Sequence, residues 1–230
     1  MNAVNHQALA EQWPSIKWIA PFAVFMALLG LMPVLELPHV WALAIRLVVP
    51  GVVFLAISRD TIEWRLTAPV TSVAVGVTVF IAWIAPDFLF DGWRSHWLFQ
   101  NSITGKLESS LAPAALSDPL SIFLRVARAV VVVPVVEELF WRGWLQRWLI
   151  RHDFQHVPLG SYTRHSFWMT ALLFASVHGP YWDVGLIAGA VYNGWMVRAR
   201  SLADLVVAHA VTNACLAAFV LRTNRWEYWL

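Results

Sequence analysis

Charged residues are scarce in this sequence. They make up 13% of its 230 residues, whereas a soluble domain carries about 25%. The formal net charge is only +2, and the basic residues are scattered rather than gathered in a stripe, which excludes a nucleic-acid partner. A single cysteine, Cys215, excludes an intramolecular disulfide. Because 59% of the residues are hydrophobic, the composition indicates an integral membrane protein.

Long apolar runs determine the predicted architecture. A membrane-spanning helix needs about 20 mostly apolar residues. Seven ranges approach this length, roughly 17–36, 39–58, 67–86, 119–141, 166–180, 182–198 and 202–221. An eighth, interfacial helix is expected in the aromatic-rich segment DGWRSHWLFQNSI, residues 91–103. The sequence therefore predicts an all-α integral membrane protein, a polytopic bundle of about seven to eight transmembrane helices.

The distribution of Lys and Arg predicts the orientation. If the N-terminus is cytoplasmic, nine of the sixteen Lys and Arg residues lie in cytoplasmic segments and four in outer segments. Cytoplasmic loops are the ones enriched in Lys and Arg, so we expect the N-terminus inside. Arg125 and Arg128 lie within the fourth range, where their charged ends are expected to reach the interface. The sequence offers no explanation for Arg46.

Two adjacent glutamates end the fourth apolar range, in the segment EELFWRG. Ionisable groups within a span cost ~2.5–3.5 kcal/mol or more, so each is a functional-site hypothesis. Glu138 and Arg142 are four positions apart on a helix, which predicts an ion pair between them. Glu137 is rotated by about 100° from Glu138 and therefore faces other groups.

Two later segments carry further polar side chains. FASVH places Phe174 and His178 on one helical face, and HAVTN places His209 and Asn213 on another. A membrane histidine often serves only as a hydrogen-bond partner between helices. Together with Glu137, however, these side chains supply a general base, imidazoles and an amide donor. Such a set can activate water and stabilise an oxyanion.

The three segments resemble, in this order, the EExxxR, FxxxH and HxxxN motifs of the CAAX prenyl endopeptidase and bacteriocin-processing family (CPBP, Abi). Any one motif is weak, whereas the ordered triple is specific. The resemblance covers about residues 119–222, the four-helix core of that family. The closing segment RTNRWEYW is similar to the bacterial branch associated with exosortase systems. We accordingly divide the chain into N-terminal helices with a long extracytoplasmic loop, 1–118, and a catalytic core, 119–230.

The resemblance implies an intramembrane endopeptidase of the glutamate type. Glu137 would be the catalytic carboxylate and would polarise water together with His178. His209 and Asn213 would bind the oxyanion of the tetrahedral intermediate. The motif residues that would support the site structurally are Glu138, Arg142 and Phe174.

A metal ion is an open question at this point. Two histidines and one glutamate match the ligand set of some catalytic zinc sites, and here they would be Glu137, His178 and His209. The sequence lacks the HExxH motif, in which two ligands lie one helical turn apart. We favour water activation that requires no cofactor and keep a zinc-dependent protease as the alternative.

The resemblance also implies partners and a location. The substrate would be a membrane-anchored protein or peptide cleaved near its C-terminus, and an exosortase-type sorting system would be a partner. The protein would be a multi-pass protein of the bacterial inner (cytoplasmic) membrane. Because hydrolysis needs water, the cavity is expected to open toward the cytoplasm or laterally toward lipid.

Two other functions remain open from the sequence. A non-catalytic scaffold, such as an immunity or assembly factor, would use the same bundle. A proton-coupled transporter would use intramembrane Glu and His, although the inverted repeats common in transporters are not evident.

The remaining polar and small residues have structural interpretations. Asp183, Asn193 and Asp204 are expected to cap helices or to form hydrogen bonds between them. Gly185 and Gly189, four positions apart in GLIAGA, predict close packing of two helices within lipid.

Overall fold

The computed structural model describes residues 13–109, 111 and 113–229. Within these residues, all the named secondary-structure elements are helices. The long helices are α2 (Ile16–Leu31), α3 (His39–Val53), α4 (Pro69–Leu89), the continuous helix α6–α8 (Pro119–Trp148), α9 (Arg164–Ser176), α10 (Trp182–Ala199) and α11 (Leu202–Thr223). They occupy the seven predicted ranges, so the predicted all-α membrane bundle is confirmed.

Four of these helices are long and apolar enough to cross a membrane. They are α3 with its π-helical extension to Ser58, α4, α6–α8 and α11. The other three are shorter or less apolar, with 16 residues in α2, 13 in α9 and 18 in α10. A tight turn, Gly179–Tyr181, joins α9 to α10. Gly179 has φ +53°, a left-handed conformation that glycine adopts without strain.

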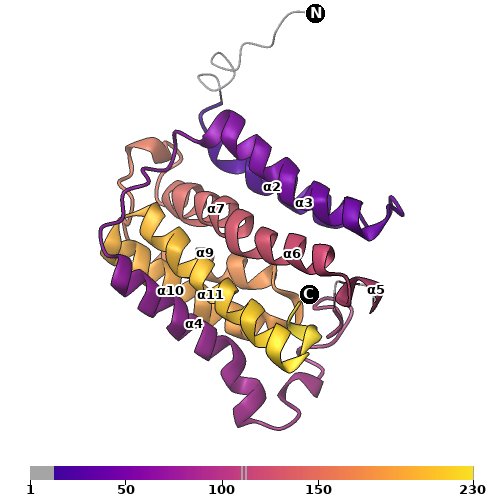
Figure 1. Ribbon diagram of the computed structural model, residues 1–230. Helices are drawn as coiled ribbons and strands as arrows, with labels where there is room; N and C mark the ends of the chain where they lie inside the picture. Colours follow the sequence, from indigo (N-terminus) through magenta and orange to yellow (C-terminus); the bar gives the residue numbers. More distant parts are fainter. Residues whose placement is uncertain (1–12, 110, 112, 230) are drawn as a thin grey trace, which may run out of the picture.

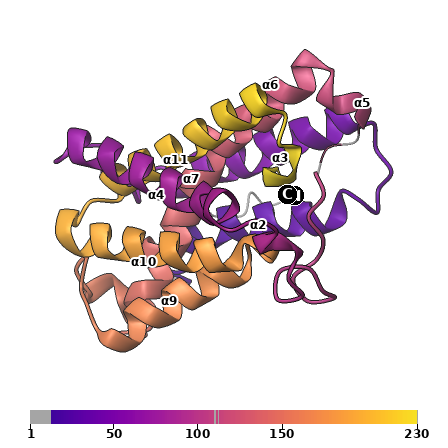
Figure 2. The ribbon, with the colours of Figure 1, turned by 90° about the horizontal axis from the view of Figure 1, so that it is seen from below.

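Figure 1 shows the helices arranged on both sides of α6 and α7. On one side, α2 and α3 pack against each other. On the other side, α4 packs against α11, and α9 packs against α10. Figure 2 shows from below that α9 and α10 form the part of the bundle farthest from α6. The helix that carries the two glutamates therefore runs through the centre of the bundle.

The central helix begins at a well-defined cap. Asp118 accepts hydrogen bonds from the backbone N–H groups of Leu120 (3.3 Å) and Ser121 (3.0 Å). Pro119 occupies the first turn, where its missing N–H costs nothing. The hydroxyl of Ser121 also donates to Asp118 at 2.6 Å, and this bond lowers the pKa of the Asp118 carboxyl.

A proline changes the winding of the central helix. The segment Arg128–Val132 is π-helical, and its end is marked by a bond from the Val133 N–H to the Arg128 carbonyl, five positions back. In that pattern, Pro134 would pair with the carbonyl of Ala129. Because proline has no N–H, that carbonyl receives no backbone donor from Pro134. Such π-helical turns are rare in proteins, and those that occur are often found at functional sites.

The central helix also continues beyond its predicted end at residue 141. Arg142 and Arg147, two of the nine Lys and Arg residues that we assigned to cytoplasmic segments, are buried within it. Arg147 donates to the carbonyls of Gly143 (2.6 Å) and Val157 (3.2 Å), and its guanidinium lies 4.6 Å from the ring centroid of Trp18. These contacts satisfy the charged side chains inside the bundle, so the two arginines lie in a helix rather than in the segment that we expected to begin after residue 141.

Residues 91–103 do not form the expected interfacial helix. Only Trp93–Ser95 makes a short 3-10 turn. The guanidinium of Arg94 forms an ion pair with Asp183 and donates to the carbonyl of Pro180 at 2.8 Å. These bonds hold the segment against the turn between α9 and α10, and the chain folds around them as an irregular loop rather than as a helix.

Asp204 joins α11 to the start of α4. Its carboxylate accepts hydrogen bonds from the N–H groups of Thr67 (2.7 Å) and Ala68 (2.9 Å) and from the hydroxyl of Ser72 (3.0 Å). Ser201 caps α11 by accepting a bond from the N–H of Asp204 (3.2 Å). Asp204 therefore forms the expected hydrogen bonds between helices, while Ser201 supplies the cap.

Two glycines allow α9 and α10 to pack closely. A Cβ atom on Gly189 would lie 3.1 Å from the Cα atom of Ala171, and one on Gly185 would lie 3.3 Å from the Cβ atom of His178. The packing interpretation of GLIAGA is therefore confirmed. The close approach also fixes the position of the segment that leads from α9 into the next turn.

Candidate active site

A cavity of about 660 Å³ lies between the central helix and the helices around it. Its lining includes Glu137 of α7 (Val133–Glu138), Phe174 of α9, His178, and two residues of α11, His209 and Asn213. The structure thus brings the three sequence motifs to one cavity. The catalytic roles of these residues stay a prediction.

Glu137 faces this cavity and is only 6% exposed. Its Oε2 atom is buried and has no hydrogen-bond partner among the described residues. Buried polar atoms in proteins nearly always have a partner. A residue of the cavity wall therefore has a buried carboxylate oxygen without a hydrogen-bond partner in this part of the chain.

Glu138 is fully buried and points to different partners. The Nη1 atom of Arg142 lies 3.1 and 3.0 Å from its two carboxylate oxygens, which confirms the predicted ion pair. Arg142 also donates through Nε to the Oδ1 atom of Asn193 (2.8 Å) and through Nη2 to the Gly189 carbonyl (3.2 Å). The pair therefore fixes the central helix against α10, along the π-helical segment Leu139–Leu145.

His209 is the second partner of Glu138. Its Nδ1 atom lies 2.7 Å from the Oε1 atom of Glu138. Because an ionised carboxylate only accepts hydrogen bonds, Nδ1 carries the proton and Nε2 remains for other contacts. The imidazole also stacks on the ring of Tyr192, with centroids 5.1 Å apart. The sequence assigned Arg142 alone to Glu138, so this contact was missed.

His178 follows the end of α9 rather than continuing the helical face predicted for FASVH. Its Nδ1 atom lies 2.6 Å from the backbone carbonyl of Phe174. A carbonyl oxygen can only accept, so Nδ1 donates and Nε2 of the neutral ring is an acceptor. The ring packs against Phe174 (centroids 4.5 Å apart) and against Trp83 of α4 (5.4 Å). These contacts fix the orientation of the imidazole.

Asn213 completes the interrupted winding of the central helix. Its Nδ2 atom donates to the carbonyl of Ala129 at 2.7 Å. This is the carbonyl that receives no N–H from Pro134. A side-chain amide has two N–H groups, so one donor of Asn213 remains for a group in the cavity.

Phe174 packs between the two histidines. Its ring centroid lies 4.5 Å from that of His178 and 6.2 Å from that of His209. The guanidinium of Arg142 lies 4.6 Å from the same centroid, on the ring face. Phe174 lines the cavity, as expected, and keeps the ion pair apart from the imidazole of His178.

Several polar residues around the site are not among the motif positions. Tyr192 donates to the hydroxyl of Thr212 at 2.7 Å, and Thr212 donates to the Gly76 carbonyl at 2.8 Å. Asn193 not only accepts from Arg142 but also donates to the Phe167 carbonyl at 2.7 Å. The sequence indicated only one of these residues, because Asn193 is a polar side chain within an apolar helix and was expected to form hydrogen bonds between helices.

The predicted zinc ligands do not form a metal site in this arrangement. No group of three or more His, Cys, Asp or Glu side chains in the described part of the chain is placed to hold a metal ion. The residues present do not fit a zinc ion here, and no catalytic step is derived through one.

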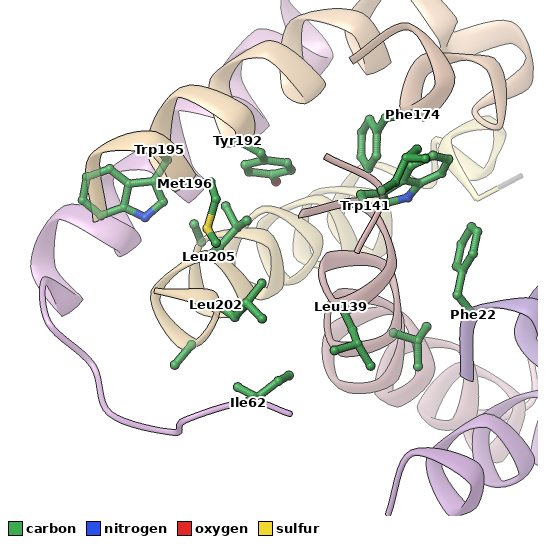
Figure 3. Packing of buried hydrophobic residues seen from close by; sticks show 14 of the residues in the cluster. Phe22, Ile62, Leu139, Trp141, Phe174, Tyr192, Trp195, Met196, Leu202 and Leu205 are labelled. Atoms are coloured by element: carbon green, nitrogen blue, oxygen red, sulfur yellow. The ribbon is translucent and has the colours of Figure 1, made fainter. Parts of the chain in front are cut away.

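The cavity extends toward the loop after α4. Thr104, Lys106 and Glu108 of that loop contribute to its lining. In the expected orientation this is the extracytoplasmic end, and the opening toward the cytoplasm or laterally toward lipid stays a prediction that depends on this orientation. Figure 3 shows Leu139 of the central helix and Leu202 of α11 within a cluster of buried apolar side chains.

The comparisons with known proteins concern the C-terminal half of the chain. Residues 119–215 match the profile of a family described as type II CAAX prenyl endopeptidase, Rce1-like. This segment is similar to that family. No curated protein and no solved structure matches the chain. The family match supports the membrane-protease family that the three motifs resemble and does not test the exosortase-associated branch.

The Rce1-like segment does not form the whole cavity. It contains the motif residues on the central helix, after α9 and on α11. Phe25 of α2, Arg46 of α3 and Trp83 of α4 also line the cavity, and all three precede the matched residues. The first three long helices therefore contribute to the candidate active site, although they carry no recognisable motif.

Proposed function

We propose that this protein is an intramembrane endopeptidase that hydrolyses a peptide bond of a membrane-anchored protein or peptide. The observation that carries the proposal is the contrast between two adjacent glutamates. Glu138 is bonded to Arg142 and His209, whereas Glu137 lines the cavity and has a buried carboxylate oxygen with no partner among the described residues. The match to a family described as type II CAAX prenyl endopeptidases supports the same activity.

In the proposed reaction, Glu137 acts as the general base. Its carboxylate takes a proton from a water molecule, whose oxygen adds to the scissile carbonyl. The Nε2 atom of neutral His178 accepts a hydrogen bond from the same water and orients it. When the tetrahedral intermediate collapses, the C–N bond breaks and the leaving amine receives the proton from Glu137.

Two donors are available for the developing oxyanion. Asn213 has an amide N–H that the Ala129 carbonyl does not use, and His209 presents Nε2, which donates when the ring is protonated. Donors held in place before the reaction stabilise the transition state more than mobile water does. The bonds to Ala129 and Glu138 hold both side chains in this way.

The test uses the full-length protein reconstituted in nanodiscs. The probe is a library of N-palmitoylated peptides with six randomised C-terminal positions, and cleavage is followed by mass spectrometry. Wild-type protein is expected to cleave a subset of the library. Glu137→Gln keeps the size of the side chain but removes the base, so cleavage is expected to fall by at least about 100-fold.

The control separates chemistry from folding. Glu63→Gln changes an exposed glutamate in the loop before α4 and is expected to retain full activity. If Glu137→Gln still cleaves the library at the wild-type rate, the assignment of the base is wrong. If wild-type protein cleaves no peptide but still functions in cells, the non-catalytic scaffold is the correct function.

The same assay addresses the metal and the partner system. Because no three His, Cys, Asp or Glu side chains of the described residues are placed to hold a metal ion, activity is expected to survive EDTA and 1,10-phenanthroline. Loss of activity that added Zn²⁺ restores would favour the metalloprotease alternative. We further propose, from the closing segment RTNRWEYW, that the protein works in the bacterial inner membrane beside an exosortase-type sorting system.

A further inference from the structure

A second polar region of the cavity contains arginine side chains. Arg128 of the π-helical segment lines the same cavity as Glu137, nine positions earlier on the same helix. Arg46 of α3 lines it from the neighbouring helix. Arg125, whose guanidinium lies 5.6 Å from the ring centroid of Trp229, lines it as well. None of these arginines belongs to the three motifs.

Arg128 is buried without an acidic partner among the described residues. It is 3% exposed, and its Nε and Nη1 atoms have no hydrogen-bond partner in that part of the chain. The Nε atom of Arg46 is also buried and has no hydrogen-bond partner among the described residues. Two other buried guanidinium groups of the bundle differ, because Arg94 and Arg142 each form an ion pair with a carboxylate. The expectation that Arg128 reaches the membrane interface is therefore wrong.

A buried guanidinium without a counterion is energetically costly. Removing a charge from water costs several kcal/mol even after relaxation of the surroundings, on the order of the whole stability of a small domain. Arg46 lies on α3, which packs against the π-helical segment of Arg128, so two like charges share this cavity. A bound anion between them would remove both costs, so the pair has the properties of an anion-binding site.

We infer that Arg128 and Arg46 bind the C-terminal α-carboxylate of the peptide substrate, at a fixed distance from Glu137. This inference rests on the proposed function. The planar guanidinium group presents paired N–H donors that match a carboxylate, which makes arginine the suited residue for this contact. The apolar and aromatic wall residues Phe25, Tyr228 and Trp229 would contact the side chains of the bound peptide.

The spacing along the helix determines how long the released fragment can be. Nine helical positions correspond to about 13 Å along the axis. An extended peptide covers about 3.3–3.6 Å for each residue, so this distance accommodates about four residues. The distance between the bound carboxylate and Glu137 would therefore select a scissile bond about three to five residues from the C-terminus.

The experiment compares two forms of one peptide library. The palmitoylated library is prepared with a free C-terminal carboxylate and, separately, with a C-terminal amide. Binding to Glu137→Gln protein in phosphatidylcholine nanodiscs is measured by fluorescence anisotropy, and cleavage by the wild-type protein is measured in parallel. The acid form is expected to bind about tenfold more tightly than the amide form.

The arginine variants test the site itself. Arg128→Gln and Arg46→Gln, each introduced into the Glu137→Gln protein, are expected to bind the acid and amide forms with affinities within about twofold of each other. Arg128→Lys, which keeps the charge, is expected to retain part of the preference. The matched control is Arg147→Gln, which changes a buried arginine whose partners are carbonyls outside the cavity. That control is expected to keep the acid preference.

Each outcome has a distinct meaning. Cleavage of both library forms at equal rates would overturn the carboxylate site and leave the endopeptidase proposal intact. Acid-selective binding without any cleavage by the wild-type protein would overturn the endopeptidase proposal and leave the carboxylate site intact. A third outcome is that binding shows no preference for the acid form and that phosphatidylglycerol co-purifies with the wild-type protein but not with Arg128→Gln. That outcome would overturn the carboxylate site and assign the arginines to a lipid phosphate. If Arg128→Gln does not fold, Arg46→Gln decides between these outcomes.

Discussion

At the scale of single residues, the carboxylate of Glu138 links two helices to the central one. It contacts Arg142 one turn later and His209 on α11. Through Arg142 the connection continues to Asn193 on α10. One buried side chain therefore orients an imidazole that lines the cavity and maintains the position of the helix beside it.

The first prediction concerns this carboxylate. Glu138→Gln leaves the buried Arg142 without its counterion, so the free energy of unfolding is expected to fall by about 3–5 kcal/mol. The measurement is an SDS titration of the protein in detergent micelles. Glu63→Gln, at an exposed glutamate, is expected to change this free energy by about 0.5 kcal/mol or less. Equal stability of both variants would contradict the role of Glu138 as a support.

The second prediction concerns the amide of Asn213. Asn213→Ala removes the proposed oxyanion donor, so kcat is expected to fall by about 100- to 1,000-fold while KM changes little. The variant also loses the bond to the Ala129 carbonyl, which is expected to cost about 1 kcal/mol of unfolding free energy. A variant that is less stable but has normal kcat would show that Asn213 only joins the two helices.

At the scale of helices, the winding of the central helix and the packing of α9 determine the geometry of the site. Pro134 leaves the Ala129 carbonyl for Asn213, and α9 lies close to α10 because Gly189 has no side chain. The same close packing places Phe174 next to Arg142. Small changes in these helices are therefore expected to disturb the cavity.

The third prediction tests the contact between α9 and α10. A Cβ at Gly189 would lie 3.1 Å from backbone atoms of Ala171, so Gly189→Ala is expected to separate the helices and to cost about 1–3 kcal/mol. Gly194 lies in the same helix, and a Cβ added there would meet no atom within 4 Å among the described residues. Gly194→Ala is therefore expected to stabilise the helix by about 0.5–1 kcal/mol. The same sign for both variants, in an SDS titration, would contradict this packing.

At the scale of the whole molecule, the cavity runs along the central helix toward one end of the bundle. The loop after α4 contributes Lys106 to its lining at that end. The helix α6–α8 leads from that loop to the loop that begins after Trp148, so the two loops lie at opposite ends. The orientation in the membrane therefore decides from which side water and substrate reach Glu137.

The fourth prediction addresses this orientation. Lys106→Cys and Arg151→Cys each place a thiol at an exposed position, one in each loop, in a Cys215→Ala background. If the N-terminus is cytoplasmic, a membrane-impermeant maleimide added to intact cells is expected to label Lys106→Cys but not Arg151→Cys. The reverse labelling pattern would show the opposite orientation and would place the mouth of the cavity in the cytoplasm.

The sequence by itself determined the membrane bundle, because apolar runs of sufficient length have few stable alternatives to helices in lipid. The spacing of Glu138 and Arg142 on one helix was likewise enough to predict their ion pair. The ordered motifs selected residues that line the cavity. The helix limits of α3, α4 and α11 lie within a few residues of the predicted ranges for the same reason.

Only the tertiary structure decided which groups face each other across different helices. The bond from His209 to Glu138, the bond from Asn213 to Ala129 and the arginines on the cavity wall depend on helix packing, which spacing along one chain cannot specify. The continuation of the central helix to Trp148 had the same origin, because partners on other segments satisfy its arginines. Local hydropathy describes each helix alone, whereas the relative rotation of neighbouring helices decides which polar groups share a cavity.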